Sequence, residues 1–209
     1  EWLWLLGNIH KEQHNKQGIY YSTSNDVEAA KKTLEEIELA SSIKDMIKEL
    51  ETPRIIWVMV PSGTVTETVL KELRELLDEG DIVLDGGNSR YTDSIKREVL
   101  FKNKGLHFLD VGTSGGQDGA RNGVCLMVGG EKEVFHRLEP LFKAISAENC
   151  YSYMGVSGSG HFVKMVHNGI EYGMMQAIGE GFDLLEASEF DFDYKEVSKV
   201  WANGSIIEG

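Results

Sequence analysis

The chain has 209 residues, a length that suits one large domain or one domain with part of a second. It carries 34 acidic and 21 basic side chains, and the formal charge of −13 excludes a general nucleic-acid binder, because neutralising phosphates requires clustered Lys and Arg. No apolar run of about 18 residues is present, so no membrane span is predicted. Cys125 and Cys150 are expected to be reduced, buried thiols of a cytoplasmic protein.

Residues 1–6 (EWLWLL) and 19–26 are expected to supply the first two strands. From residue 54 onward, short apolar runs alternate with stretches of helical periodicity. The runs predict strands at residues 54–60, 81–87, 107–112 and 125–130, and the periodic stretches predict helices at residues 66–78, 92–104 and 131–145. This alternation predicts an α/β fold with a mostly parallel sheet. Because the strands are continuously apolar, helices are expected on both faces of the sheet.

Glycine and polar residues follow three of the predicted strands, at residues 61–63 (PSG), 86–89 (GGNS) and 113–116 (TSGG). In parallel sheets, ligands bind at the carboxyl ends of the strands. The three clusters therefore predict a binding site along this edge of the sheet. The alternative for each cluster is a turn that binds nothing.

The pattern changes after residue 155, where a joint rich in Gly and Ser precedes a long helical stretch. We place a domain boundary near residue 157 and predict a helix from residue 161 to about 187. This helix is apolar around most of its circumference, so it is expected to be buried.

Four polar side chains lie on one face of that helix: Lys164, His167, Asn168 and Glu171. Burying such groups is costly unless they are paired or functional. The apolar neighbours of Lys164 favour its neutral amine, which is the form that acts as a general base. Glu171 is then a candidate general acid. The alternative is a structural Lys164–Glu171 bridge beside a hydrogen-bonded His167.

Three separate segments carry a family resemblance: residues 85–89 (DGGNS), 108–116 (FLDVGTSGG) and 160–176 (GHFVKMVHNGIEYGMMQ). In this order they resemble the decarboxylating 6-phosphogluconate dehydrogenases, and the match covers about residues 53–187. The resemblance implies a Rossmann-type domain that binds NAD or NADP over residues 1–157. It also implies that residues 158–209 begin an all-helical substrate and dimerisation domain.

The resemblance further implies a role for each matching residue. Lys164 takes the proton of the substrate 3-hydroxyl as hydride leaves C3, and Glu171 protonates C1 of the enediol that remains after loss of CO2, giving ribulose 5-phosphate. The implied substrate-binding residues are Asn88, Ser114, Gly115, Gly116, His167, Asn168 and Tyr172. The implied cofactor-binding residues are Val60, Pro61, Ser62 and Asn88. The expected partners are the sugar phosphate and, if the helical domain is complete, a second copy in a homodimer. No metal, membrane or nucleic acid is expected.

The first strand departs from the family pattern. A dinucleotide loop of this kind has the form G-x-G-x-x-G, but residues 1–20 contain only Gly7 and Gly18. Gly7 is assigned to the end of this fingerprint. An acidic residue at the end of the second strand favours NAD and an arginine favours NADP. Ser22, Thr23 and Ser24 stand there instead, with Asp26 slightly later and no arginine following, so the cofactor preference stays open.

Three functions remain open on this sequence. The leading one is oxidative decarboxylation of 6-phosphogluconate, a reaction of the pentose phosphate pathway, in a chain that we expect to be truncated. A related dehydrogenase of smaller 3-hydroxy acids, acting without decarboxylation, is the second. The third is a catalytically inactive binding module derived from the family, which the altered glycine loop favours.

Overall fold

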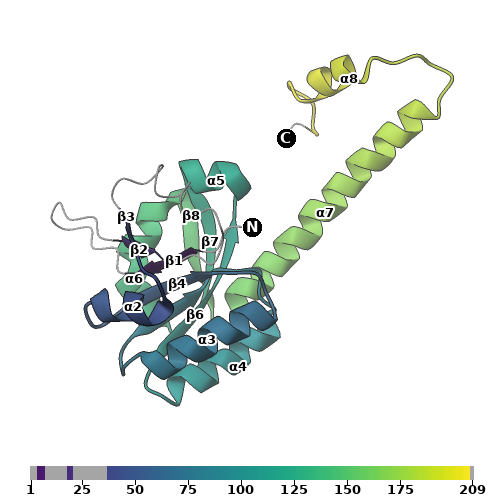
Figure 1. Ribbon diagram of the computed structural model, residues 1–209. Helices are drawn as coiled ribbons and strands as arrows, with labels where there is room; N and C mark the ends of the chain where they lie inside the picture. The colour runs from purple at the N-terminus through teal and green to yellow at the C-terminus, as the bar shows by residue number, and fades with distance from the viewer. Residues whose placement is uncertain (1–3, 8–17, 21–36, 208–209) are drawn as a thin grey trace. The chain divides into compact units, whose positions relative to one another are not determined.

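The computed structural model describes residues 4–7, 18–20 and 37–207 (Figure 1). The chain divides into two compact units, residues 1–166 and 167–209, which are taken in turn below. The domain boundary near residue 157 stays a prediction.

An eight-stranded sheet forms the centre of the first unit. Its strands are β1 (Trp4–Gly7), β2 (Gly18–Tyr20), β3 (Ile37–Leu39), β4 (Ile55–Met59), β5 (Ile82–Asp85), β6 (His107–Ser114), β7 (Val124–Gly130) and β8 (Ser146–Gly155). Across the sheet the order is β3-β2-β1-β4-β5-β6-β7-β8. Strands β4, β5 and β6 are parallel neighbours, as are β2 and β3, and β7 and β8. The predicted Rossmann-type, mostly parallel α/β fold is confirmed.

Two strands run against the predicted direction. β7 lies antiparallel to β6, because the short α5 (Gly116–Asn122) turns the chain back instead of crossing over the sheet. β1 lies next to β4, the place expected of a first strand, but is antiparallel to it. Gly7 therefore pairs with Ile56 near the amino end of β4. Residues 8–17, where a glycine loop would follow, lie outside the described residues.

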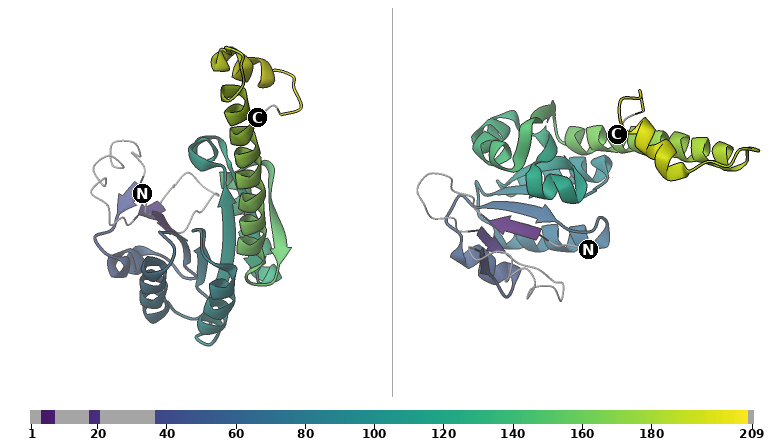
Figure 2. Two further views of the ribbon diagram at one scale, coloured as in Figure 1. Left: turned by 90° about the vertical axis from the view of Figure 1, so that its right-hand side faces the viewer. Right: turned by 90° about the horizontal axis from the view of Figure 1, so that it is seen from above.

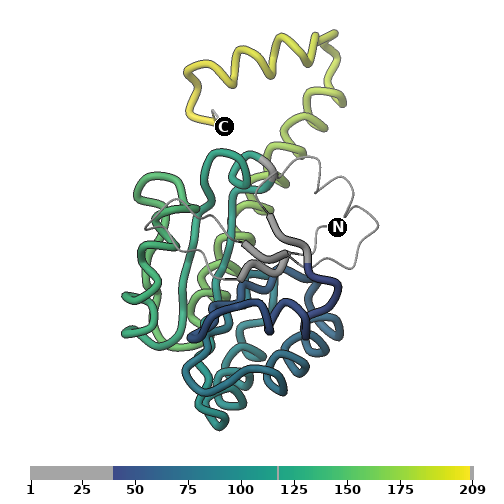
Figure 3. Tube along the Cα trace, turned by 60° about the vertical axis from the view of Figure 1, so that its left-hand side comes forward, coloured from purple at the N-terminus to yellow at the C-terminus, as the bar shows by residue number. Residues whose placement is uncertain are grey.

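Helices pack on both faces of the sheet (Figure 2). They are α2 (Ile43–Glu49), α3 (Thr64–Leu76), α4 (Tyr91–Lys102) and α6 (Lys132–Ile145). Alternate strand residues point to opposite faces: Ile56, Val83 and Phe108 belong to the core under α2, α3 and α4. Trp57, Leu84 and Leu109 belong to the core under α6. Helices α3 and α4 lie side by side on their face (Figure 3).

Two helices include most of the remaining chain, α7 (Ser159–Glu186) and α8 (Tyr194–Trp201). The predicted bounds of the long helix agree with α7 to within about two residues, but its predicted burial is wrong. Only Gly160 and His161 of α7 are buried, while Ile170 and Leu184 are 61% and 74% exposed. An apolar face is fully buried only where other elements cover it, and in the described part of the chain the fully buried residues of α7 are confined to its first turn.

Both cysteines are free thiols, as expected, but they are half-buried rather than buried. Cys125 faces Ser114 across the β6–β7 pair. Partial burial, the largest cause, and the nearby Cys150 raise the pKa of the Cys125 thiol, against an opposing effect of Lys164. Within the described ranges, no helix is both long and apolar enough to cross a membrane.

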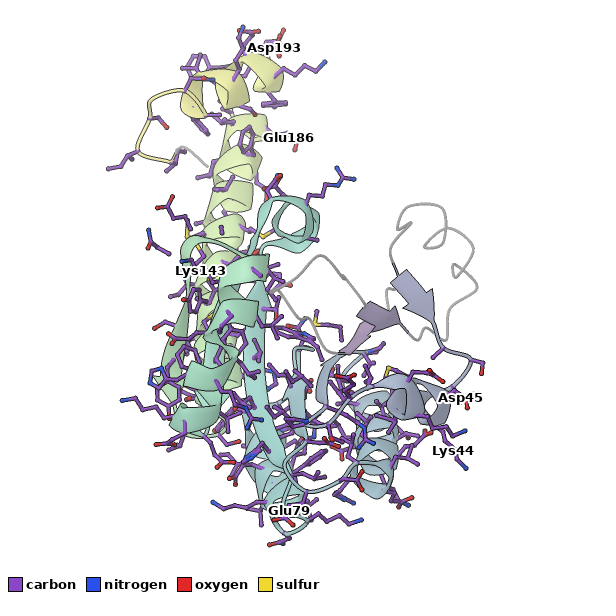
Figure 4. All side chains as sticks on the ribbon, turned by 90° about the vertical axis from the view of Figure 1, so that its left-hand side faces the viewer. Lys44, Asp45, Glu79, Lys143, Glu186 and Asp193 are labelled. Carbon is purple, nitrogen blue, oxygen red and sulfur yellow. The ribbon has the colours of Figure 1, made fainter. Side chains whose placement is uncertain are left out.

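The hydrogen bonds at the start of α2 predict a pH-dependent contribution to stability. Asp45 lies in the first turn of α2, where it is labelled in Figure 4. Hydrogen bonds from the Ser41 and Ser42 hydroxyls and from Lys48 lower its pKa from 3.8 to about 2. The lowered pKa means that ionised Asp45 stabilises the folded chain above pH 3.8, and that this contribution is lost as the pH falls through about 2. We expect Ser41→Ala to move the pKa back toward 3.8, measured by NMR titration of the carboxyl carbon. An unchanged pKa in that variant would contradict the assigned cause.

Candidate functional site

The loops after β4 and β5 meet at the carboxyl edge of the sheet. A Cβ placed on Gly87 would lie 2.9 Å from the carbonyl oxygen of Val60, so only a glycine lets the two loops approach this closely. The buried Thr66 of α3 donates its hydroxyl to the carbonyl oxygen of Pro61 at 2.9 Å and fixes the first loop. Val60 is buried, whereas Pro61, Ser62 and Asn88 are exposed. The structure therefore brings these four predicted cofactor residues to one edge of the sheet, where all but Val60 are exposed.

A buried charge network lies beneath the second loop. Asp85, the last residue of β5, accepts the Gly87 N–H at 3.1 Å and a guanidinium hydrogen bond from Arg97 of α4 at 2.7 Å. Arg97 also donates to Glu67 of α3 at 2.6 Å. The side chains of Arg97 and Asp85 are 4% and 1% exposed. The network therefore ties α3 and α4 to the strand end that carries the Asn88 loop.

The predicted site residue Ser114 lies on one face of β6 together with two residues that were not predicted. Asp110, Gly112 and Ser114 alternate along the strand and share a face. A Cβ on Gly112 would lie 2.5 Å from the Cβ of Lys164, so α7 rests on the strand at this glycine. Lys164 is half-buried there, one strand step from half-buried Ser114. The exposed Gly115 and Gly116, both at positive φ, then lead into α5.

The carboxylate of Asp110 anchors the first turn of α7. One of its oxygens accepts the N–H of Gly158 at 2.6 Å and the other accepts the N–H of His161 at 2.8 Å. These are two of the donors that a helix start leaves without partners, and a carboxylate there also meets the positive end of the helix dipole. His161 is itself buried and its Nδ1 lies 2.8 Å from the Ser94 hydroxyl of α4.

Close backbone packing at Gly160 gives a sharp stability test. A Cβ at Gly160 would overlap the carbonyl oxygen of Met127 and lie 2.5 Å from that of Asp110, and neither strand backbone can move aside freely. We expect Gly160→Ala to destabilise the fold by about 1–3 kcal/mol or more, as overpacking does. Gly173→Ala is the control in the same helix, because its Cβ meets nothing within 4 Å and should stabilise slightly. Thermal unfolding checks both, and equal losses in the two variants would contradict the packing.

The remaining predicted residues lie on α7 within the second unit. His167 Nδ1 lies 3.7 Å from a carboxylate oxygen of Glu171 and 3.3 Å from Oδ1 of Asn168. Asn168 is half-buried, and His167, Glu171 and Tyr172 are exposed. The His167–Glu171 pair was not predicted; the bridge considered from the sequence joined Lys164 to Glu171 instead.

The structure groups the predicted residues of the first unit, with one exception. Val60, Asn88, Ser114 and Lys164 follow or flank the carboxyl ends of β4, β5 and β6. Gly7 lies at the opposite edge, because β1 is reversed.

The sequence reasoning missed the supporting residues Asp110, Arg97 and His161. A signal for Asp110 was present: a charged residue inside the apolar run FLDVG must find buried partners if that run is a strand. The partners of Arg97 and His161 come from distant segments, so no local pattern predicts them.

Two further features of the described residues lie apart from this edge. An open cleft of about 890 Å³ lies between α6 and β8, lined among others by His136, Lys143 and Tyr151, and it includes none of the predicted site residues. In the described part of the chain, no group of three or more His, Cys, Asp or Glu side chains is placed to hold a metal ion.

Comparison with known proteins gives one consistent family. The NAD binding domain of 6-phosphogluconate dehydrogenase matches residues 5–155, and the C-terminal domain of 6-phosphogluconate dehydrogenase matches residues 160–189. YqeC of Bacillus subtilis, which carries the name of a 6-phosphogluconate dehydrogenase, is 54% identical over 170 residues, covering 81% of this chain and 57% of that protein. The NAD(+)-dependent, decarboxylating 6-phosphogluconate dehydrogenase of Haloferax volcanii is 44% identical over 171 residues, covering 81% and 56%.

Among solved structures, the Plasmodium falciparum 6-phosphogluconate dehydrogenase, determined with its cofactor NADP+ and with its substrate 6-phosphogluconate, superposes with a TM-score of 0.81. It is 31% identical, and the match covers 92% of this chain and 44% of that one. The chain thus spans about half the length of the proteins it matches.

Proposed function

Because the chain belongs to the 6-phosphogluconate dehydrogenase family, we propose that it acts in the oxidative decarboxylation of 6-phosphogluconate to ribulose 5-phosphate with reduction of NAD or NADP. The observation that carries the proposal is that Lys164 lies half-buried on Gly112, which precedes Ser114 on the same face of β6, at the edge where β4 and β5 present Ser62 and Asn88. The match of residues 5–155 to the NAD binding domain of this family supports it.

The residues at this edge fit the nicotinamide end of a dinucleotide. Exposed Ser62 and Asn88 offer a hydroxyl and an amide, and the close Gly87–Val60 approach brings together the two loops that carry them. The fit does not extend to the pyrophosphate: reversed β1 carries Gly7 to the opposite edge. The dinucleotide supplies the hydride acceptor when it is bound. Pro61, Ser62 and Asn88 would hold its nicotinamide end over the sugar.

Lys164 has the first chemical role in this proposal. Its amine accepts the proton of the substrate 3-hydroxyl while the C3–H bond breaks with its electron pair, leaving a 3-keto acid. The C1–C2 bond then breaks, CO2 departs and the electron pair forms the enediolate. The protonated amine stabilises this developing negative charge, which a positioned cation does best where water is partly excluded.

Glu171 completes the proposed reaction by protonating the carbon that lost CO2. Positions 164, 168 and 171 are four and three residues apart on α7, the spacing of neighbours on one helix face. His167 holds Glu171 at 3.7 Å, and we assign His167 and Asn168 to the substrate hydroxyls and Tyr172 to the phosphate. The Ser114 hydroxyl and the N–H groups of Gly115 and Gly116 would orient the substrate carboxylate.

A two-stage experiment tests the proposal. Calorimetric titration with NAD and with NADP measures dinucleotide binding. Turnover is then followed as NAD(P)H absorbance together with released CO2, using 6-phosphogluconate and, in parallel, 3-hydroxyisobutyrate. Equal amounts of CO2 and reduced dinucleotide from 6-phosphogluconate support the proposal. Reduction with 3-hydroxyisobutyrate alone favours the non-decarboxylating dehydrogenase.

The reversed β1 favours a second candidate function, a binding module without catalysis. In that case neither dinucleotide binds at millimolar concentration, and no substrate is turned over.

We further propose a homodimer in the cytoplasm, as the sequence predicts. Light scattering on the purified chain measures its mass in solution.

A further inference from the structure

We propose that Asp110 is a positioning residue that holds Lys164 in register with Ser114. This inference rests on the proposed function, because it assigns the reacting amine to Lys164. Asp110 does not approach the substrate in this proposal. It acts through the first turn of α7.

The cap that Asp110 supplies comes from the sheet and not from the helix itself. In a capping box, the side chain of the residue just before the helix accepts the backbone N–H of the third helical residue. The side chain of that third residue in turn accepts the backbone N–H of the residue before the helix. At α7 the first of these positions is Gly158, which has no side chain. One carboxylate from β6 binds both donors instead, the N–H of Gly158 at 2.6 Å and the N–H of His161 at 2.8 Å.

This long-range cap fixes the first turn of α7 relative to the sheet, and a second contact fixes it relative to α4. A cap made by a helix's own residues moves with the helix, whereas a cap from a central strand fixes the helix relative to that strand. Asp110 is fully buried, and Gly129 and Gly160 bring the β7 and α7 backbones together around it. His161 adds a second tie, to Ser94 of α4 at 2.8 Å.

The fixed register then determines where the amine lies. Asp110, Gly112 and Ser114 occupy successive positions on one face of β6. Asp110 holds residue 161, and Lys164 follows one helical turn later on Gly112. The next position on that strand face is Ser114. A shift of the first turn by about 1 Å would displace Lys164 from Ser114, and such a displacement of a reacting group can cost about 10²-fold in rate.

The test compares Asp110→Asn with Asp81→Asn. Asp81 is the control because it is equally buried and also accepts two backbone N–H groups, from Arg54 at 2.6 Å and Asp78 at 3.0 Å, but it lies before β5 at the amino edge of the sheet. It additionally accepts the Arg54 guanidinium at 2.8 Å, so its loss of stability should be at least as large. We expect both variants to lose thermal stability. Only Asp110→Asn should lower kcat for 6-phosphogluconate, by about 10²-fold with KM little changed. Equal kcat values in the two folded variants would overturn the proposal.

A second measurement does not depend on turnover. Acetic anhydride acetylates exposed amines, and the ratio of Lys164 to exposed Lys132 modification is read from the same digest by mass spectrometry. Loss of the cap should raise this ratio about fivefold in Asp110→Asn and leave it unchanged in Asp81→Asn. An unchanged ratio in Asp110→Asn would overturn the positioning role.

The two proposals fail in different ways. If the wild-type chain does not turn over 6-phosphogluconate, the proposed function has failed, and the acetylation ratio alone decides whether Asp110 positions Lys164. If circular dichroism shows that Asp110→Asn is unfolded, both measurements are repeated on Asp110→Glu. That variant keeps the carboxylate but displaces it by one methylene, and it should change kcat and the ratio in the same directions.

Discussion

We expect the proposed turnover of 6-phosphogluconate to fall about 10²–10⁴-fold when Lys164 is replaced by methionine, the usual contribution of a positioned general base. Methionine keeps the length and apolar stem of the side chain, so it can still pack on Gly112, but it has no amine to take the 3-hydroxyl proton. Dinucleotide affinity should change little, because Lys164 contacts the sugar in the proposed arrangement. Initial rates of NAD(P)H formation and calorimetric titration measure the two effects separately.

The matched control is Lys132→Met. It removes the same charge from the exposed first residue of α6, on the other face of the sheet, and should leave the rate unchanged. A Lys164→Met variant that keeps the wild-type rate would remove Lys164 from the mechanism. Equal losses in both variants would point to net charge as the cause.

Replacing Arg97 by methionine should destabilise the first unit by about 3–5 kcal/mol, because it leaves the Asp85 carboxylate buried without its cation. Asp85 would retain the Gly87 N–H, a single neutral donor. Urea denaturation followed by circular dichroism measures the free energy of unfolding.

Two further variants distinguish the effect of leaving a buried carboxylate unpaired from the effect of removing a surface charge. Lys96→Met removes the adjacent cation of α4, whose pair with Asp93 at 3.3 Å is exposed, and should cost less than about 1 kcal/mol. Adding Asp85→Asn to Arg97→Met should recover part of the loss, because the orphaned charge is then gone. If the double variant recovers none of the lost free energy of unfolding, the unpaired Asp85 carboxylate is not the cause of the loss.

Local periodicity predicted the elements of the first unit that are long and strongly patterned. β4, β5 and β6, with helices α3, α4 and α6, lie within a few residues of their predicted places, because burial on one or both faces fixes their apolar spacing. The direction of β7 was missed, since apolar spacing is the same for parallel and antiparallel strands. β8 and α8 were missed as well. β8 is half-exposed and has no continuous apolar run, and α8 is only eight residues long, too short for its periodicity to stand out.

The residue types of the candidate site were predictable from the sequence, but the buried residues that hold them in place were not. Gly and polar clusters marked the edge of the sheet correctly, since strand ends in parallel sheets gather there. The burial predicted for α7 was wrong because an apolar helix face shows that a partner surface is needed, not that this chain supplies one. Arg97 reaches across to Glu67, 30 positions away, and such pairings emerge only once the chain has folded.

The alternation along β6 limits how this strand can vary among related proteins. Leu109 and Val111 point into the α6 core, while Asp110 and Gly112 point toward α7. Deleting or inserting one amino acid between 107 and 114 would exchange these two sets, sending a carboxylate into packed hydrocarbon and leucine toward the amine. Natural relatives should therefore tolerate replacements here far better than changes in the length of this segment.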